Sequence, residues 1–185
     1  MPALLERQRR AASVEGPVAR VGGERAKARS AAAGAAARPV AAMVAAAFSL
    51  SAGLVHFVYT PDHWWVWWGY GLFFLGAGLL QTGLGVLLVL RRPPVAVTLA
   101  AIAGNAAIIV IYAISRTPYG ALIGPMRGHS ELPGLVDMAT TMGELVTVIA
   151  LLALLPRRAV GWVTSFLLCV GVGLWLLRLT GQLVY

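Results

Sequence analysis

The sequence predicts an all-α integral membrane protein with five transmembrane helices. The composition is 59% hydrophobic and only 12% charged, which is typical of a chain that lies in lipid. Five apolar runs each approach or exceed the length of about 20 residues that a helix needs to cross the core of a bilayer. Short segments rich in Pro, Gly or Arg separate these runs, and such segments favour turns and loops.

The five predicted spans make up one transmembrane domain, residues 39–185. Pro39 suits the first turn of the first span, because the N–H that proline lacks has no helical partner there. The longest connection, residues 116–134, contains three prolines and four glycines, so we expect it to be irregular. The spans cover residues 39–59, 67–90, 95–115, 135–155 and 159–179.

Residues 1–38 form a different region, rich in Ala, Gly and Arg. They carry eight of the fifteen Lys and Arg residues and few large apolar ones, so we expect a disordered basic cytoplasmic tail. A net charge of +8 would suit a nucleic-acid partner. Four further Arg residues stand in pairs between spans, however, and this placement is typical of membrane topology signals. We therefore expect the lipid bilayer, and no nucleic acid, as a partner.

The positive charges also predict the orientation of the chain. The pairs Arg91–Arg92 and Arg157–Arg158 share a side with the basic tail, since two spans separate each cluster from the next. The positive-inside rule places that side in the cytoplasm, so the N-terminus is expected inside and the C-terminus outside. The connections that follow the first and third spans then lie on the outer side.

Each of the first four spans has one face of small or polar residues. A helix turns by about 100° per residue, so positions three, four and seven apart share a face. We expect an antiparallel four-helix bundle with these faces inward and the fifth helix on its periphery. The faces consist of Ala45, Ser49, Ala52 and His56; Gly71, Phe74, Gly78, Gln81 and Gly85; Thr98, Ala101, Asn105, Tyr112 and Arg116; and Asp137, Thr141 and Glu144.

Glu144, a carboxylic acid deep in the fourth span, is the sharpest functional signal. It lies roughly 14 Å below the outer boundary, and Asn105 reaches a similar depth. A charged group there costs several kcal/mol, so it is normally protonated, paired or near water. One hypothesis is a protonated side chain that ties helices together, and the other is a proton or cation relay. The expected intramembrane network is Gln81, Asn105, Thr141 and Glu144, with Gln81 lower, in the inner half.

Histidines and carboxylates near the outer boundary suggest a metal site. Their nitrogen and oxygen atoms suit one divalent ion, Zn, Fe, Mn or Cu, although no compact ligand motif is present. The alternative is that the loop histidines are solvated and His56 serves a helix contact. Arg116 and Arg127 can neutralise nearby carboxylates or bind lipid phosphate. The candidate ligands are His56, His63, His129, Asp137 and Glu144, and the charges expected at the mouth are Asp62, Arg116, Arg127 and Glu131.

Four tryptophans crowd into one boundary: Trp64, Trp65, Trp67 and Trp68. An aromatic belt at the membrane surface explains them, and a quinone or lipid pocket is the alternative. The single cysteine, Cys169, excludes a disulfide framework within the chain. The chain has none of the motifs GxxxxGK[ST], GxGxxG and HExxH, so nucleotide binding and zincin-type proteolysis have no support.

A series of short motifs carries a resemblance to a known group. The motifs are His56-Phe57, His63-Trp64, Gly71 to Phe74 with Gln81, Gly104-Asn105, Ser115-Arg116-Thr117, and Asp137 followed by Glu144. In these the chain resembles small multi-span membrane proteins of high-GC actinobacteria, over about residues 51–155. The resemblance implies a multi-pass protein of a bacterial plasma membrane and carries no activity with it.

Three functional hypotheses follow from the sequence. The first is a membrane protein that binds or passes a cation, a metal ion or a proton, at an outward-facing polar site between helices. The second is an accessory or assembly subunit of a larger membrane complex or a homo-oligomer, in which the polar faces serve assembly. The third is a small metal-dependent membrane oxidoreductase. The sequence leaves open whether the protein is an enzyme.

Overall fold

The computed structural model describes residues 25, 29, 38–117 and 120–180. The predicted disordered tail, residues 1–38, lies almost wholly outside them. The chain divides after Pro39 into two units, and the account below concerns the second, Val40–Tyr185. Within the described residues this unit is helical except for its connections and one isolated β-bridge between Gly120 and Arg127.

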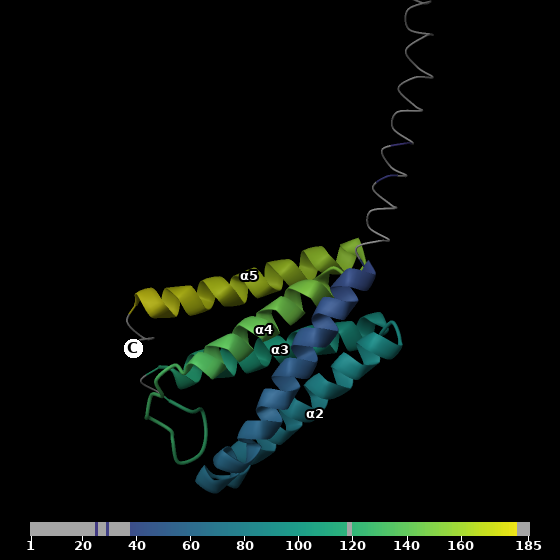
Figure 1. Ribbon diagram of the computed structural model, residues 1–185. Helices are drawn as coiled ribbons and strands as arrows, with labels where there is room; N and C mark the ends of the chain where they lie inside the picture. The colour runs from purple at the N-terminus through teal and green to yellow at the C-terminus, as the bar shows by residue number, and fades with distance from the viewer. Residues whose placement is uncertain (1–24, 26–28, 30–37, 118–119, 181–185) are drawn as a thin grey trace, which may run out of the picture. The chain divides into compact units, whose positions relative to one another are not determined.

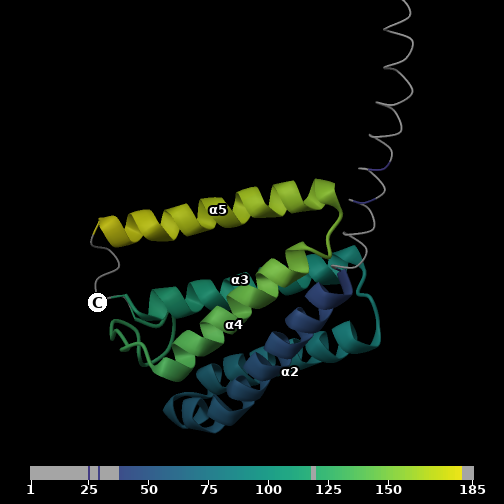
Figure 2. The ribbon, with the colours of Figure 1, turned by 45° about the horizontal axis from the view of Figure 1, so that its top comes forward.

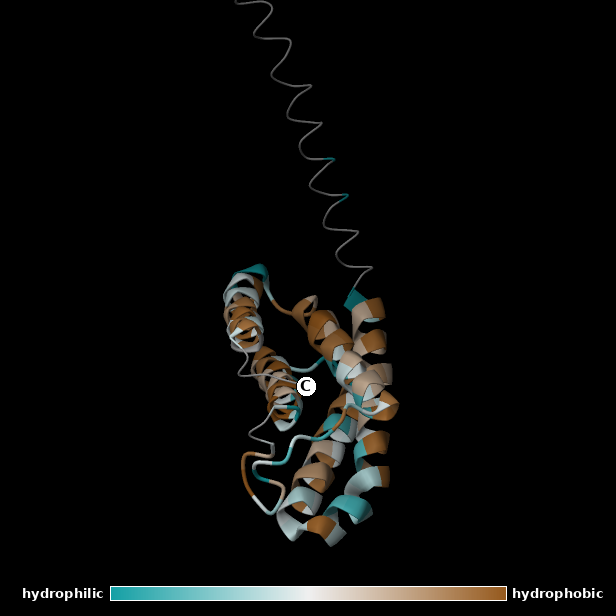
Figure 3. Ribbon diagram, turned by 90° about the vertical axis from the view of Figure 1, so that its left-hand side faces the viewer, coloured by the Kyte–Doolittle hydropathy of each residue, from teal (hydrophilic) through white to brown (hydrophobic). Residues whose placement is uncertain are grey.

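The described residues contain five helices long and apolar enough to cross a membrane (Figure 1). This confirms the predicted all-α class and the predicted number of helices that could span a membrane. They are the first helix, Arg38–Val66; α2, Trp68–Leu90; α3, Val95–Ser115; α4, Leu135–Leu152; and α5, Arg157–Leu179. Hydrophobic residues dominate the helices, and hydrophilic residues gather where helices end (Figure 3).

The first helix is longer than the predicted span, which ended at residue 59. It continues through Pro61 to Val66, and only Trp67, in an extended conformation, separates it from α2. Its 29 residues extend about 44 Å, whereas the hydrocarbon core is about 30 Å thick. The polar residues after Tyr59 therefore do not end the helix.

Glycines bring the first helix and α2 into close contact. A Cβ at Gly53 would meet Thr82 Oγ1 at 2.5 Å, one at Gly78 would meet the Phe57 ring at 2.8 Å, and one at Gly85 would meet Leu50 Cγ at 2.5 Å. Only glycine leaves room for backbones this close. We call these three residues the glycine seam.

An apolar core joins all five helices at one end. It lies near the two turns that carry the Arg pairs, and we call this end the Arg-pair side. The first half of α5 packs against the core from outside, but no described residue of α5 is buried (Figure 2). The core consists of Ala45, Ala46, Leu84, Leu88, Ile102, Val148, Ala150, Leu151 and Leu155.

The opposite end carries the four tryptophans and the connection between α3 and α4, and we call it the Trp-rich side. Tyr70, in the first turn of α2, holds this connection: its hydroxyl donates to the Ile123 carbonyl at 2.7 Å and accepts from Met126 N–H at 3.2 Å. Gly124 has a φ of +86°, and its position against the rings of Tyr70 and Trp67 leaves no room for a side chain. The part of the connection from Ile123 to Met126 is therefore held against α2.

Candidate functional site

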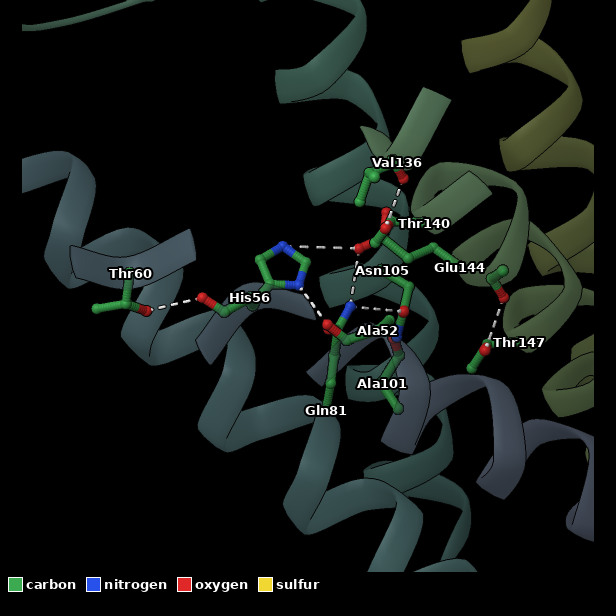
Figure 4. A network of polar contacts seen from close by, with 11 residues as sticks. Ala52, His56, Thr60, Gln81, Ala101, Asn105, Val136, Thr140, Glu144 and Thr147 are labelled. Carbon is green, nitrogen blue, oxygen red and sulfur yellow. Dashed lines mark hydrogen bonds and ion pairs between the residues drawn. The ribbon is translucent and has the colours of Figure 1, made fainter. Parts of the chain in front are cut away.

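Four polar side chains meet in the interior between the apolar core and the Trp-rich side, one from each of the first four helices (Figure 4). They are His56, Gln81, Asn105 and Glu144, and each is at most 5% exposed. We call them the polar cluster. Buried polar groups are costly unless they are hydrogen-bonded, so their partners decide what the cluster can do.

Gln81 is the centre of the cluster. Its side-chain amide Nε2 donates to Glu144 Oε1 at 2.8 Å and lies 3.4 Å from Asn105 Oδ1. Its backbone carbonyl accepts a hydrogen bond from Ser49 Oγ at 2.7 Å. Gln81 thus links α2 to the first helix, α3 and α4. His56 interacts with the side chains of both Glu144 and Gln81.

Gln81 was predicted to lie deeper than Glu144, and the hydrogen bond shows that this was wrong. The depth had been counted from the start of each span. The relative axial position of α2 and α4 brings Gln81 Nε2 to Glu144 Oε1, and counting from the span ends did not give that position. Glu144 and Asn105 do meet at one level, but Gln81 connects them, and Asn105 Nδ2 donates to Ala101 O at 2.8 Å. Thr141, also predicted in the network, lies half-buried three residues before Glu144.

His56 contributes an acceptor to the cluster. Its Nδ1 is 2.9 Å from the Ala52 carbonyl oxygen, which can only accept, so Nδ1 carries a hydrogen. In the neutral ring Nε2 then has a free lone pair. Nε2 lies 4.0 Å from Glu144 Oε1, too far for a direct hydrogen bond and near enough for strong electrostatic coupling.

The cluster contains more acceptors than donors. Gln81 Oε1 is buried and has no hydrogen-bond partner in the described part of the chain. Glu144 is 1% exposed, and no Lys or Arg among the described residues pairs with it. A carboxylate in such surroundings needs a positive charge or a proton of its own. The vacant acceptors therefore suit an electropositive occupant.

A second group of charges lies at the Trp-rich side and is centred on Arg116. Its guanidinium contacts Glu131 at 2.8 Å and Asp137 at 2.9 Å, donates to Leu132 O at 3.3 Å, and stacks over the Tyr112 ring at 4.6 Å. Asp137 also accepts from the Gly134 N–H at the start of α4, where a negative charge is favourable. We call Arg116, Glu131 and Asp137 the arginine network.

The predicted metal ligands are distributed over several places. His56 and Glu144 lie in the polar cluster, and Asp137 pairs with Arg116. His63 stacks on Phe74 with ring centroids 3.6 Å apart, and His129 is exposed in the connection between α3 and α4. Among the described residues no three His, Cys, Asp or Glu side chains gather as a metal-binding group. The two remaining mouth residues, Asp62 and Arg127, are exposed.

Sequence reasoning missed two contributors. Tyr70 holds the connection between α3 and α4, and Phe74 contacts both His56 and His63. Phe74 could have been found, because it shares a helical face with Gln81. Tyr70 could not, because nothing in the sequence pattern distinguished it from the tryptophans around it.

No family model, curated protein or solved structure matches this chain. The structure itself defines a class. Five apolar helices long enough to span a bilayer, with polar side chains buried among them, are consistent with a multi-pass membrane protein.

Proposed function

We propose that this protein binds or passes a cation at the polar cluster, and that the proton is the cation the cluster suits best. The observation that carries the proposal is Glu144, buried to 1% exposure without a Lys or Arg partner among the described residues and beside the unpartnered Gln81 Oε1. Intramembrane carboxyl groups of this kind are characteristic of proton and ion pathways.

The geometry favours a proton over a divalent metal. A proton on Glu144 needs one acceptor, and the His56 Nε2 lone pair lies 4.0 Å away, a gap that a small movement or one water closes. A zinc-type ion needs three or four ligands at about 2 Å. His56 and Glu144 supply two, and Asp137 would have to leave Arg116 to join them.

The proposed arrangement is an antiparallel four-helix bundle around the cluster with α5 at its edge. The Arg pairs support an orientation with the Arg-pair side in the cytoplasm. In that orientation, access to the polar cluster from the Trp-rich side would be access from the outer face of the membrane. The resemblance to actinobacterial membrane proteins supports a bacterial plasma membrane as its location.

The test is proton flux into proteoliposomes that carry a pH-sensitive dye, driven by a potassium diffusion potential. Glu144→Gln keeps the shape and the hydrogen bond from Gln81 but cannot release a proton, so its flux should fall to that of protein-free vesicles. Asp137→Asn is the matched control, because Asp137 belongs to the arginine network, and it should keep most of the flux. Equal flux for wild type and Glu144→Gln would exclude the proton pathway.

Metal analysis of the purified protein tests the other cation. A bound metal at one ion per chain that is lost in both His56→Ala and Glu144→Gln would make the cluster a metal site and would revive the oxidoreductase hypothesis. A metal-free protein without proton flux would exclude both forms of the proposal.

An accessory subunit is the second candidate function, and α5 favours it. The helix exposes Trp162, Phe166 and Trp175 at 84%, 66% and 59%, and no described residue of α5 is buried. Lipid can cover such a face, and so can another membrane helix. Purification in mild detergent distinguishes the two, since an accessory subunit would elute with a larger complex.

A further inference from the structure

The polar cluster and the Trp-rich side are joined by a column of rings. His56 and His63 lie seven residues apart on the first helix, which places them on one face, two turns from each other. His56 is buried, whereas His63 is half-buried near the helix end. The line between them is the shortest way from the cluster to the Trp-rich side along this helix.

Phe74 of α2 contacts both histidines. Its ring stacks on His63 with centroids 3.6 Å apart and an interplanar angle of 21°, and it lies 5.3 Å from the His56 ring at 49°. Phe74 also lies seven residues before Gln81, so the two side chains share a face of α2. The Phe74 ring therefore lies between the polar cluster and the His63 ring, toward the Trp-rich side.

His63 is held in position for this contact. Its Nδ1 donates to the Tyr59 carbonyl at 2.9 Å, and the Tyr59 ring meets it edge-on with centroids 6.5 Å apart. The ring has one hydrogen bond to its own helix and one aromatic face on Phe74. The two stacked rings cover each other's faces at van der Waals distance, so the contact resists opening.

The two helices themselves cannot separate easily here. The glycine seam brings their backbones together at Gly53, Gly78 and Gly85, and Gly71 packs against Trp64 near the Trp-rich side. Opening by helix movement would break all of these contacts at once. Rotation of one side chain is a much smaller change, and aromatic side chains change rotamer far faster than helices move.

We propose that Phe74 is a gate that closes the polar cluster from the Trp-rich side, with the His63 ring as its stop. The inference rests on the proposed function for its meaning, since it says by which side and past which residue a cation reaches Glu144. The gate itself is a statement about access and holds or fails on measurements of access.

The test is the reaction rate of a cysteine placed beside the cluster, two turns before His56 on the first helix. Cys169 is exposed and is first replaced by Ser, and Ser49→Cys then puts a thiol of nearly the same size beside the Gln81 carbonyl. A small, cationic, membrane-impermeant methanethiosulfonate is added to one side of oriented vesicles at a time. The cationic probe suits a site rich in acceptors.

With Phe74 intact, the cysteine should react slowly from both sides. Phe74→Ala should raise the rate from the Trp-rich side about tenfold, equivalent to about 1.4 kcal/mol of opening free energy. Phe74→Leu, which keeps most of the volume but not the stacking, should raise it less. Phe73→Ala is the matched control, because Phe73 is the neighbouring residue of α2 and meets the Phe74 ring edge-on, with centroids 5.8 Å apart, whereas Phe74 itself stacks on the His63 ring. Phe73→Ala should therefore raise the rate far less than Phe74→Ala.

Two results would overturn the gate: equal rates for Phe74→Ala and Phe73→Ala, or acceleration only from the Arg-pair side. Size-exclusion profiles show whether the variants are folded, and if Phe74→Ala is not, Phe74→Leu decides the question. Labelling needs no proton transfer by Glu144, so a normal gate with no proton flux would refute the proton pathway and leave the gate standing.

Discussion

The polar cluster and the arginine network both contain carboxyl groups on α4, yet they differ in what neutralises them. Asp137 meets a guanidinium at 2.9 Å and is about two-fifths exposed, whereas Glu144 is almost fully buried and meets a neutral amide. A carboxylate with an arginine partner has its charge satisfied and serves structure. A buried carboxyl with only an amide donor and a nearby imidazole can gain or lose a proton, and this difference makes Glu144 the functional candidate.

We expect the arginine network to lie at a membrane boundary and the polar cluster to lie within the bilayer. A cysteine near Gly128 should therefore react with an impermeant reagent from one side only, and one near Pro93 from the other side only. Ser130→Cys is the conservative choice for the first, because Gly128 has a φ of +81° that other residues adopt with strain. The expected effect is all or none, and the positive-inside rule predicts the outer side for Ser130.

Labelling of both positions from the same side would show that they do not lie on opposite sides of the membrane. It would also contradict every depth assigned to the cluster. The parent protein for both variants carries Cys169→Ser.

Removal of the guanidinium should have the largest effect on stability. Arg116→Ala leaves Glu131 and Asp137 without a positive partner and removes the stacking on Tyr112. We expect a loss of about 2 kcal/mol, below the value for a fully buried ion pair because both carboxylates keep contact with solvent. Thermal unfolding in detergent measures this, and Arg127→Ala, an exposed residue of the same connection, should change little.

A variant Arg116→Ala as stable as wild type would mean that the network is not structural. A carboxylate with an arginine partner could then no longer be taken as the structural counterpart of Glu144.

Replacement of Gln81 by the nearly isosteric Met should have a smaller effect. Gln81→Met deprives Glu144 and Asn105 of a donor but also removes the unpartnered Oε1, so the two changes partly offset each other. We expect a loss of about 1 kcal/mol, within the range measured for polar contacts between membrane helices. Leu80→Met, at a neighbouring position that is 76% exposed, is the control for the introduction of Met into the same turn of α2.

Glu144→Gln should have the smallest effect on folding. The amide keeps an acceptor for Gln81 Nε2, so the free energy of unfolding should change by no more than about 0.6 kcal/mol, whereas Glu144→Leu should lose the contact entirely. Measured together with the proton flux, this variant separates assembly from proton chemistry. A large loss of stability in Glu144→Gln would place the role of Glu144 in assembly.

Much of the fold was accessible from the sequence because hydropathy and helical period are local properties. The glycine stripe of α2 was expected to face a neighbouring helix, and Gly78 and Gly85 do so, while Gly76 and Gly83, off the stripe, have open space beside them. The helix ends were less accessible. The first helix extends beyond its predicted end at residue 59 because polar residues can continue a helix, although they do not suit the core of a bilayer.

The candidate site was accessible in part. His56, Gln81, Asn105 and Glu144 were each singled out, because a polar residue on a small-residue face points inward. Their mutual arrangement was not, since Gln81 was placed too deep and its role as the link between Asn105 and Glu144 was not foreseen. The sequence places Asp137 on the same helical face as Glu144, yet in the structure Asp137 forms an ion pair with Arg116.

The sequence by itself determined the all-helical class, the five apolar helices and the small set of polar residues that must avoid lipid. Only the tertiary structure decided which of these residues meet. The axial position of one helix against another is fixed by non-local packing, of which the glycine seam between the first helix and α2 is one example, and a shift of one turn, about 5.4 Å, is enough to exchange one partner for another. Because of that register Gln81 reaches Glu144, and Glu144 has no arginine within reach among the described residues.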